Sequence, residues 1–202
     1  MSQWDQLASK ESIDKTIEAL EANGIDAKFV QTGKEAKIEV LSLIPQGAEV
    51  MNMTSRTLDT LGIAKEIEES GKYNSMRKKL MSMDRNTMGN EMRKMGAAPD
   101  WAVGSVHAVT ENGHVLIASN SGSQLPAYIN GSAHVVWVAG AQKIVKDMQE
   151  GIKRIDEYCL PLENERAQKV YGMGSAVKKI IIINKETPGR INLILVNEVL
   201  GF

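Results

Sequence analysis

The sequence contains little of several features that mark whole classes of protein. Its 202 residues include one cysteine and 4% aromatic residues, and 24 Lys and Arg nearly balance 25 Asp and Glu. A net charge of −1 argues against a protein that binds nucleic acid by neutralising phosphates. The longest apolar run, 180–183, is far shorter than the roughly 20 residues of a membrane helix. With 43% hydrophobic residues, the chain is predicted to fold as a soluble protein.

The single thiol, Cys159, can form no internal disulfide and cannot by itself hold an iron–sulfur cluster or a cysteine-based zinc ion. An unpaired cysteine is typical of the reducing cytosol, and residues 1–5 lack the start of a signal peptide. We therefore expect a cytoplasmic protein with no metal or cofactor of its own, no nucleic-acid partner and no membrane segment. The length predicts one domain over residues 1–202.

Helix and strand patterns alternate at short spacing in the first sixty residues. A helix is predicted for 9–23 and a strand for 26–31, followed by a helix after Thr32 and a strand over 48–53. This alternation is typical of βα units and predicts a mainly parallel sheet between two helical layers. Asn112-Gly113 predicts a hairpin. Further strands are predicted at 101–110, 114–119, 134–139, 180–183 and 191–196, and a helix at 147–158 whose buried face includes Ile152, Ile155 and Cys159.

The segment 72–96 differs in composition from the rest, with six methionines and an excess of Lys and Arg. Met88, Met92 and Met95 fall at helical spacing on one face. One interpretation is an amphipathic helix that buries these methionines. The other is a mobile lid that attracts an anionic substrate, because methionine side chains repack easily.

Three polar loops follow predicted strands, at the edge where open α/β sheets bind ligands. Each precedes a helix whose free N–H groups can bind an anion, although ordinary helix capping explains each loop taken alone. We expect a phosphate or carboxylate of a small metabolite to bind here. The predicted ligand-binding residues are Thr54, Ser55, Arg56, His107, Thr110, Asn120, Ser121, Gly122, Ser123, Gln124, Gly140, Gln142 and Lys143.

Glu111 occupies the tip of the predicted hairpin. It is either a solvated turn carboxylate or a nucleophile or general base that faces a pocket. The three histidines form no metal-ligand pattern, and the sequence has no phosphate-binding P-loop, no GxGxxG and no GxSxG.

Several segments, in order, resemble the LUD-domain family of lactate-utilisation proteins. The matching runs are Gly104–Gly113 (GSVHAVTENG), Gly140–Val145 (GAQKIV), Ile152–Ile155 (IKRI), Pro161–Arg166 (PLENER) and Arg190–Phe202. The resemblance implies a three-layer α/β/α fold related to sugar-phosphate isomerases and CoA transferases. It also implies a small anionic metabolite, a role in using lactate or a related organic acid, and partner subunits that carry iron–sulfur clusters. Assembly into a homo-oligomer is a further expectation.

Two other interpretations remain open. Glu111-Asn112-Gly113 is similar to the Glu-Asn-Gly of CoA transferases, which would make the chain a CoA-transferase- or isomerase-like enzyme that uses Glu111. The third interpretation is a non-catalytic assembly subunit of a redox complex.

Overall fold

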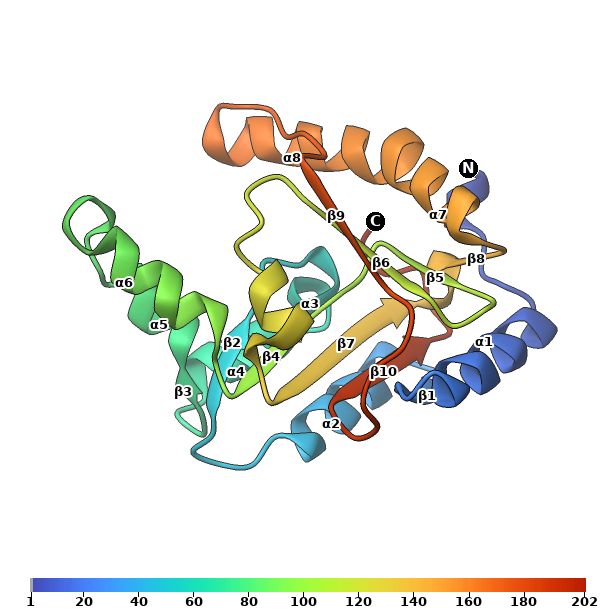
Figure 1. The fold of residues 1–202 in the computed structure, drawn as a ribbon, viewed down its shortest axis with the longest axis horizontal. Coiled ribbons are helices and arrows are strands. Elements are labelled where there is room, and N and C mark those ends of the chain that lie inside the picture. The colour runs from blue at the N-terminus through green and yellow to red at the C-terminus, as the bar shows by residue number, and fades with distance from the viewer. Residues whose placement is uncertain (1) are drawn as a thin grey trace.

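A six-stranded sheet forms the centre of the computed structural model, which describes residues 2–202 (Figure 1). The strand order is β1-β10-β7-β4-β2-β3, and every pair is parallel. Strand β10 lies between β1 and β7, with Leu193 opposite Ala27 on one side and Trp137 on the other. The predicted parallel sheet is therefore confirmed. Its strands are β1 (Asp26–Val30), β2 (Glu49–Asn52), β3 (Asn74–Ser75), β4 (Trp101–Gly104), β7 (His134–Gly140) and β10 (Ile191–Val196).

One face of this sheet is covered by α2 (Gly33–Leu43), α3 (Arg56–Thr60) and α4 (Ile63–Glu69). The start of α2 is set by a capping box, in which Thr32 and Glu35 each accept from the other's backbone N–H. Apolar side chains of these helices bury the sheet face that carries Val136, Val138 and Ile194.

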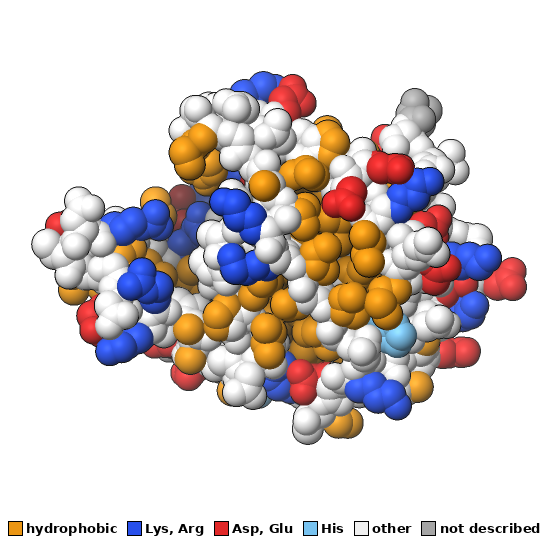
Figure 2. Space-filling model, turned by 45° about the horizontal axis from the view of Figure 1, so that its top comes forward, with side chains coloured by type: hydrophobic (Ala, Val, Ile, Leu, Met, Phe, Trp, Pro, Cys, Tyr) orange, Lys and Arg blue, Asp and Glu red, His pale blue; other side chains and the backbone are white. Residues whose placement is uncertain are grey.

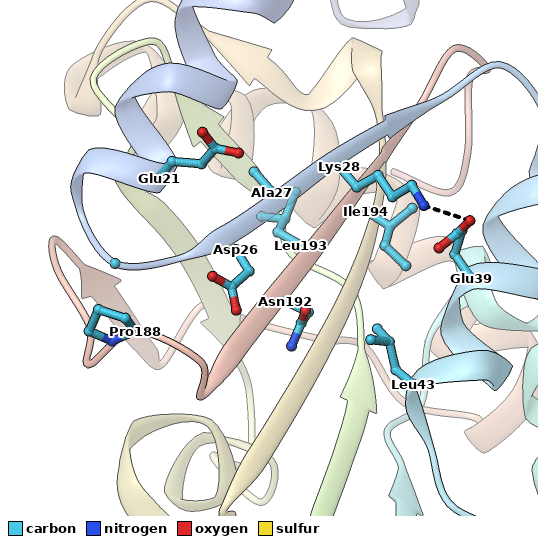
Figure 3. A pocket seen from close by; sticks show the side chains of 11 residues that line it. Glu21, Asp26, Ala27, Lys28, Glu39, Leu43, Pro188, Asn192, Leu193 and Ile194 are labelled. Atoms are coloured by element: carbon cyan, nitrogen blue, oxygen red, sulfur yellow. Dashed lines mark ion pairs between the residues drawn. The ribbon is translucent and has the colours of Figure 1, made fainter.

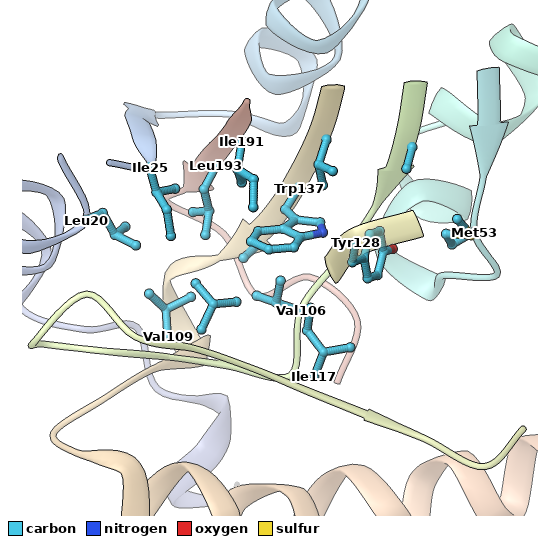
Figure 4. Packing of buried hydrophobic residues seen from close by; sticks show 14 of the residues in the cluster. Leu20, Ile25, Met53, Val106, Val109, Ile117, Tyr128, Trp137, Ile191 and Leu193 are labelled. Atoms are coloured by element: carbon cyan, nitrogen blue, oxygen red, sulfur yellow. The ribbon is translucent and has the colours of Figure 1, made fainter. Parts of the chain in front are cut away.

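The opposite face packs against α1 (Lys10–Ala22), the π-turn η2 (Ala127–Gly131) and a second sheet. Figure 4 shows Trp137 in the middle of this core, with Tyr128 edge-on to its ring at 5.4 Å between centroids. Helices thus lie on both sides of a mainly parallel sheet, which confirms the three-layer α/β/α class.

The second sheet was not foreseen. It has the order β8-β5-β6-β9, with β5 (Ala108–Thr110) and β6 (Val115–Ser119) forming the predicted hairpin. Gly113 has a φ of 74° at its tip and lies so close to the backbone of Ala19 that a Cβ would collide. The remaining strands are β8 (Ile144–Val145) and β9 (Lys179–Ile183).

Two sequence expectations change because of this second sheet. The single strand expected over 101–110 is broken at 105–107, where the chain leaves one sheet for the other. The two closing strands β9 and β10 are consecutive but belong to different sheets. Strand β10 is almost fully buried within the parallel sheet, whereas β9 forms an edge and is only partly covered.

A long helix packs outside the second sheet, and it contains a local irregularity. It runs through α7 (Met148–Arg154), the π-turn η4 (Ile155–Cys159) and α8 (Leu160–Tyr171). Pro161 lacks the N–H that regular helical bonding requires, which is a common cause of such a turn. The buried face runs through Gly151, Arg154, Ile155 and Cys159, so Ile152 is 38% exposed and Arg154 is fully buried. The prediction that Ile152 is buried was wrong.

The Met-rich segment is helical, as α5 (Met76–Met81) and α6 (Arg85–Ala97), and projects from the body in Figure 1. The expected burial of its methionine stripe is only partial, because Met92 and Met95 are half-buried and no residue of α6 is fully buried. Met88 is 41% exposed. None of the helices within residues 2–202 is long and apolar enough to cross a membrane.

Candidate functional site

Four strands of the parallel sheet end around the side chain of Lys143, which lies in a short 3-10 turn, η3 (Ala141–Lys143), after β7. Its Nζ donates to Ser105 Oγ and Val106 O at 3.1 Å each, and to Thr57 Oγ1 at 3.4 Å. These three oxygens match the three donors of a protonated amine. Lys143 is 2% exposed and forms no salt bridge within residues 2–202.

The segment after β10 closes this centre. The carbonyl oxygen of Leu200 accepts from Thr57 Oγ1 at 3.2 Å and from Gln142 Nε2 at 3.0 Å. Gly140 permits this approach, because a Cβ there would lie 2.3 Å from Glu198 O. Gln142 Oε1 is buried with no hydrogen-bond partner among the described residues.

A second buried cation, Arg154, lies near Lys143. Its Nη1 donates to His107 O at 2.5 Å and to Cys159 Sγ at 3.0 Å, and its guanidinium stacks over Tyr158. Nε and Nη2 are buried without a partner in residues 2–202. The π-turn brings Cys159, five residues further on, beneath this guanidinium.

Burying these two cations lowers the stability of the folded protein, because no carboxylate within residues 2–202 hydrogen-bonds to either. Burial lowers the pKa of Lys143 to about 7, with the nearby positive charge of Arg154 as the second cause. Burial also lowers the pKa of Arg154. Uncompensated buried charges with perturbed pKa values are typical of sites that bind or react with a ligand.

His107 lies beside both cations and is held in its neutral form. Burial, followed by the charges of Lys143 and Arg154, lowers its pKa to about 3. Its Nδ1 accepts from the backbone N–H of Ala118 at 3.2 Å, so the proton of the neutral ring is on Nε2. His107 is therefore a fixed hydrogen-bond donor at neutral pH.

A small cavity of about 40 Å³ adjoins this centre. Arg154 hydrogen-bonds to two of the residues that line it, His107 and Cys159. Burial raises the pKa of Cys159, so its thiol is neutral. The lining is completed by Ala118, Ser119, Asn120, Ile155, Leu160, Glu163, Ser175, Ala176 and Val177. Glu163 forms a paired, two-bond contact with Arg166, at 2.6 and 2.7 Å.

Only part of the predicted ligand-binding set lies at this centre. Lys143, Gln142 and Gly140 lie at the end of β7, and His107 and Asn120 line the adjoining cavity. The loop 120–124 follows β6 of the second sheet, so it does not share the carboxyl edge of the parallel sheet as we expected.

The other predicted residues have local contacts. Ser55 Oγ caps α3 by accepting from Leu58 N, and Thr110 Oγ1 accepts from His114 N. Thr54 and Arg56 are exposed. In the loop after β6, Gln124 Oε1 accepts from Ser119 Oγ, Ser121 Oγ donates to Ser123 Oγ, and Gly122 N donates to Ser119 Oγ.

Glu111 is attached to α1 rather than to this centre. Its carboxylate accepts from Ser12 Oγ at 2.7 Å and from Lys15 Nζ at 2.9 Å. These hydrogen bonds lower its pKa. Within residues 2–202 no hydrogen bond or ion pair joins it to Lys143 or Arg154.

The sequence interpretation missed Thr57, Ser105, Arg154 and Cys159 as members of the site. Arg154 lies in the IKRI run, so the family resemblance was the available signal for it. Ser105 lies in the family-like run Gly104–Gly113, so the same signal was available for it, whereas the role of the Thr57 and Ser105 hydroxyls depends on where the strands end.

The comparisons with known proteins agree with this architecture. The model of the LUD domain family matches residues 13–196. The chain belongs to the LUD domain family. A DUF162 family protein from Deinococcus radiodurans has a similar fold, with a TM-score of 0.60 and 10% identity over 95% of this chain and all of that one.

More distant structural similarity links this LUD domain to eIF2B beta from Chaetomium thermophilum. That match has a TM-score of 0.41 and 10% identity, and it covers 69% of this chain and 48% of the other. No curated protein matches the sequence. Within residues 2–202 no group of three His, Cys, Asp or Glu side chains is placed to hold a metal ion.

Proposed function

We propose that this LUD domain binds a small organic anion at the Arg154–Lys143 centre. The observation that carries the proposal is the fully buried guanidinium of Arg154, whose nitrogen atoms Nε and Nη2 have no partner in residues 2–202. A buried cation of this kind costs several kcal/mol unless an anion neutralises it. A carboxylate can accept two parallel N–H bonds from a guanidinium, which matches the free edge of Arg154.

The surroundings of Arg154 suit a ligand of only a few non-hydrogen atoms. The adjoining cavity of about 40 Å³ is small, and its polar lining comes mainly from neutral donors and acceptors. His107 supplies an N–H that stays on Nε2 at neutral pH, and Ser119 and Asn120 add further polar groups. The ligand class is therefore a short carboxylate or a similarly small oxyanion.

The wider role follows from the family and from the single cysteine. We infer that the domain works in the cytoplasm in the use of lactate or a related organic acid. Because Cys159 is the only thiol of the chain, an iron–sulfur cluster would have to be held by partner subunits. Growth on L-lactate should fail when the protein is deleted, and unimpaired growth would contradict this role.

The alternative that uses Glu111 as a CoA-transferase-like nucleophile has less support, because Ser12 and Lys15 already bind that carboxylate. This alternative predicts that the wild-type protein catalyses acyl-CoA exchange and that Glu111→Gln abolishes the exchange. The absence of exchange by the wild-type protein would exclude it. A purely structural assembly subunit would bind the cluster-bearing partner but none of the small anions.

Calorimetric titration with L-lactate, pyruvate, acetate and phosphate tests the proposed site. We expect saturable binding of at least one of them, weakened at least about 30-fold in Arg154→Met. Lys153→Met is the matched control, because the neighbouring Lys153 side chain is 56% exposed and should leave binding unchanged. The proposal fails if the wild type binds none of these anions at millimolar concentration. It also fails if a folded Arg154→Met or Arg154→Lys binds as the wild type does.

A further inference from the structure

The projecting helices α5 and α6 carry a large share of the positive charge of the molecule. We call residues 76–97 the arm. The arm contains six Lys and Arg and two Asp and Glu, a net charge of +4, so the rest of the chain has a net charge of −5. Figure 2 shows Lys and Arg side chains over this projection, whereas at the opposite end acidic side chains are mixed with Lys and Arg.

The arm also presents apolar side chains that the molecule itself leaves uncovered. Met81 is 75% exposed and Met88 is 41% exposed, and α6 has no buried residue. An isolated helix of this length is only marginally stable in water, so α6 gains most from a surface that covers its methionines. Methionine side chains adapt readily to such a surface.

A groove with the complementary chemistry lies at the other edge of the parallel sheet. It has a volume of about 430 Å³ and lies along the outermost strand β1, where α1 covers one face of the sheet and α2 covers the other (Figure 3). Ala27, Leu43 and Pro188 contribute apolar surface to its floor, above the buried Leu193 and Ile194. Glu21 and Asp26 lie on its rim, and neither forms an ion pair within residues 2–202.

The remaining charges of the groove are balanced, because Lys28 Nζ lies 2.7 Å from Glu39 Oε1. The groove therefore keeps two uncompensated carboxylates beside an apolar floor. A cationic helix with a methionine face fits this combination, which is the helix-in-groove mode of recognition.

An arm cannot reach the groove of its own molecule. The arm directly follows β3, whereas the groove borders β1. Strands β1 and β3 are the two outermost strands of the six-stranded sheet. Five interstrand spacings separate them, about 24 Å. Contact between two arms is disfavoured because both carry net positive charge.

We propose that the arm of one copy docks in the groove beside β1 of a second copy. Its arginines and lysines would meet Glu21 and Asp26, while its methionines would cover the apolar floor. Since the contact joins two different surfaces, it builds closed rings or chains of copies.

Sedimentation velocity on paired charge reversals tests this contact. Arg85 and Arg93 of the arm form no ion pair within residues 2–202, so Arg85→Glu with Arg93→Glu changes the arm without breaking an internal contact. Glu21→Lys with Asp26→Lys reverses the groove. We expect the wild type to associate at about 50 mM salt and to dissociate at about 0.5 M salt, where charges are screened.

Each doubly reversed variant should be monomeric alone, and an equimolar mixture of the two should associate again. Lys34→Glu with Lys146→Glu is the control, because both lysines are exposed, lie outside the arm and give the same change in net charge. A wild type that stays monomeric at low salt would overturn the proposal. So would an arm variant that associates as strongly as the wild type. Binding of a monomeric wild type to vesicles containing phosphatidylserine would also overturn it, in favour of a lipid surface.

Discussion

The molecule holds positive charge in two places that differ in almost every physical respect. Lys143 and Arg154 are buried, and each has neighbours fixed by several strands and a π-turn. The cations of the arm are mostly exposed and lie on two short helices with few contacts. A buried charge changes stability, pKa and ligand affinity, whereas an exposed charge mainly affects long-range attraction. The comparison predicts large, pH-dependent effects at one place and small effects at the other.

The largest expected difference is in how stability depends on pH. The pKa of Lys143 is about 7 in the folded protein against an ordinary 10.5, so above pH 7 only the unfolded chain keeps this proton. The free energy of unfolding should therefore rise between pH 7 and pH 10, by up to about 4 kcal/mol. Urea unfolding should show this rise in the wild type and in the arm variant Lys94→Met. The rise should be absent in Lys143→Met, and equal slopes in all three proteins would contradict the prediction.

A second, smaller effect is expected in acid. His107 has a pKa of about 3 when folded against an ordinary 6.5, so below pH 6.5 the unfolded chain takes up a proton that the folded protein refuses. The free energy of unfolding should fall as the pH drops from 6.5 toward 3, by about 2 kcal/mol at pH 5. His107→Gln should flatten this part of the profile. The prediction is wrong if the variant loses stability in acid as steeply as the wild type.

Replacing one buried and one exposed arginine by methionine compares the two places directly. Arg154→Met removes a desolvated charge and replaces it with an apolar side chain of similar length, so the unfolding free energy without ligand should be equal to or above that of the wild type. Arg93→Met in the arm should change it by less than about 0.5 kcal/mol. Urea unfolding measures both values. A loss of several kcal/mol in Arg154→Met would show that its hydrogen bonds to His107 and Cys159 outweigh the cost of burial.

The smallest energetic effect is expected for methionine oxidation. Met81 and Met88 are exposed, whereas Met53 and Met76 are 6% and 3% exposed. Mild peroxide treatment at about 0.5 M salt, where the copies are expected to be apart, should oxidise the first pair well before the second, with a change in unfolding free energy below about 0.5 kcal/mol. Peptide mass spectrometry measures the order. Equal rates at Met76 and Met88 at this salt concentration would contradict the exposure of Met88 in the single copy.

Sequence periodicity predicted the parallel sheet well because its strands are short, apolar and separated by capped helices. Thr32 and Gly113 show why local signals worked, since a capping box and a left-handed turn are formed by neighbouring residues. The second sheet was missed because its strand pairs depend on distant partners. Nothing in residues 179–183 indicates that they pair with β6 instead of β10.

The candidate site, like the fold, was predicted only in part. Lys143 was found because it directly follows a buried strand that points to the ligand-binding edge. Arg154 was missed because the buried face was placed on Ile152 instead of Gly151, and because an arginine in a helix is usually exposed to solvent. The buried methionine stripe was predicted from spacing alone, and spacing does not tell whether a second surface is present to cover it.

The place of β10 in the sheet has a consequence for how the protein is made. Within residues 2–202, β1 pairs with β10 alone, so β1 waits for residues 191–196 to be synthesised before it has a neighbouring strand. During translation the first helix and strand can be held only by local contacts. The central sheet is thus completed late, by insertion of β10 between β1 and β7, and a nascent chain halted before residue 191 would expose the apolar face of β1 to chaperones.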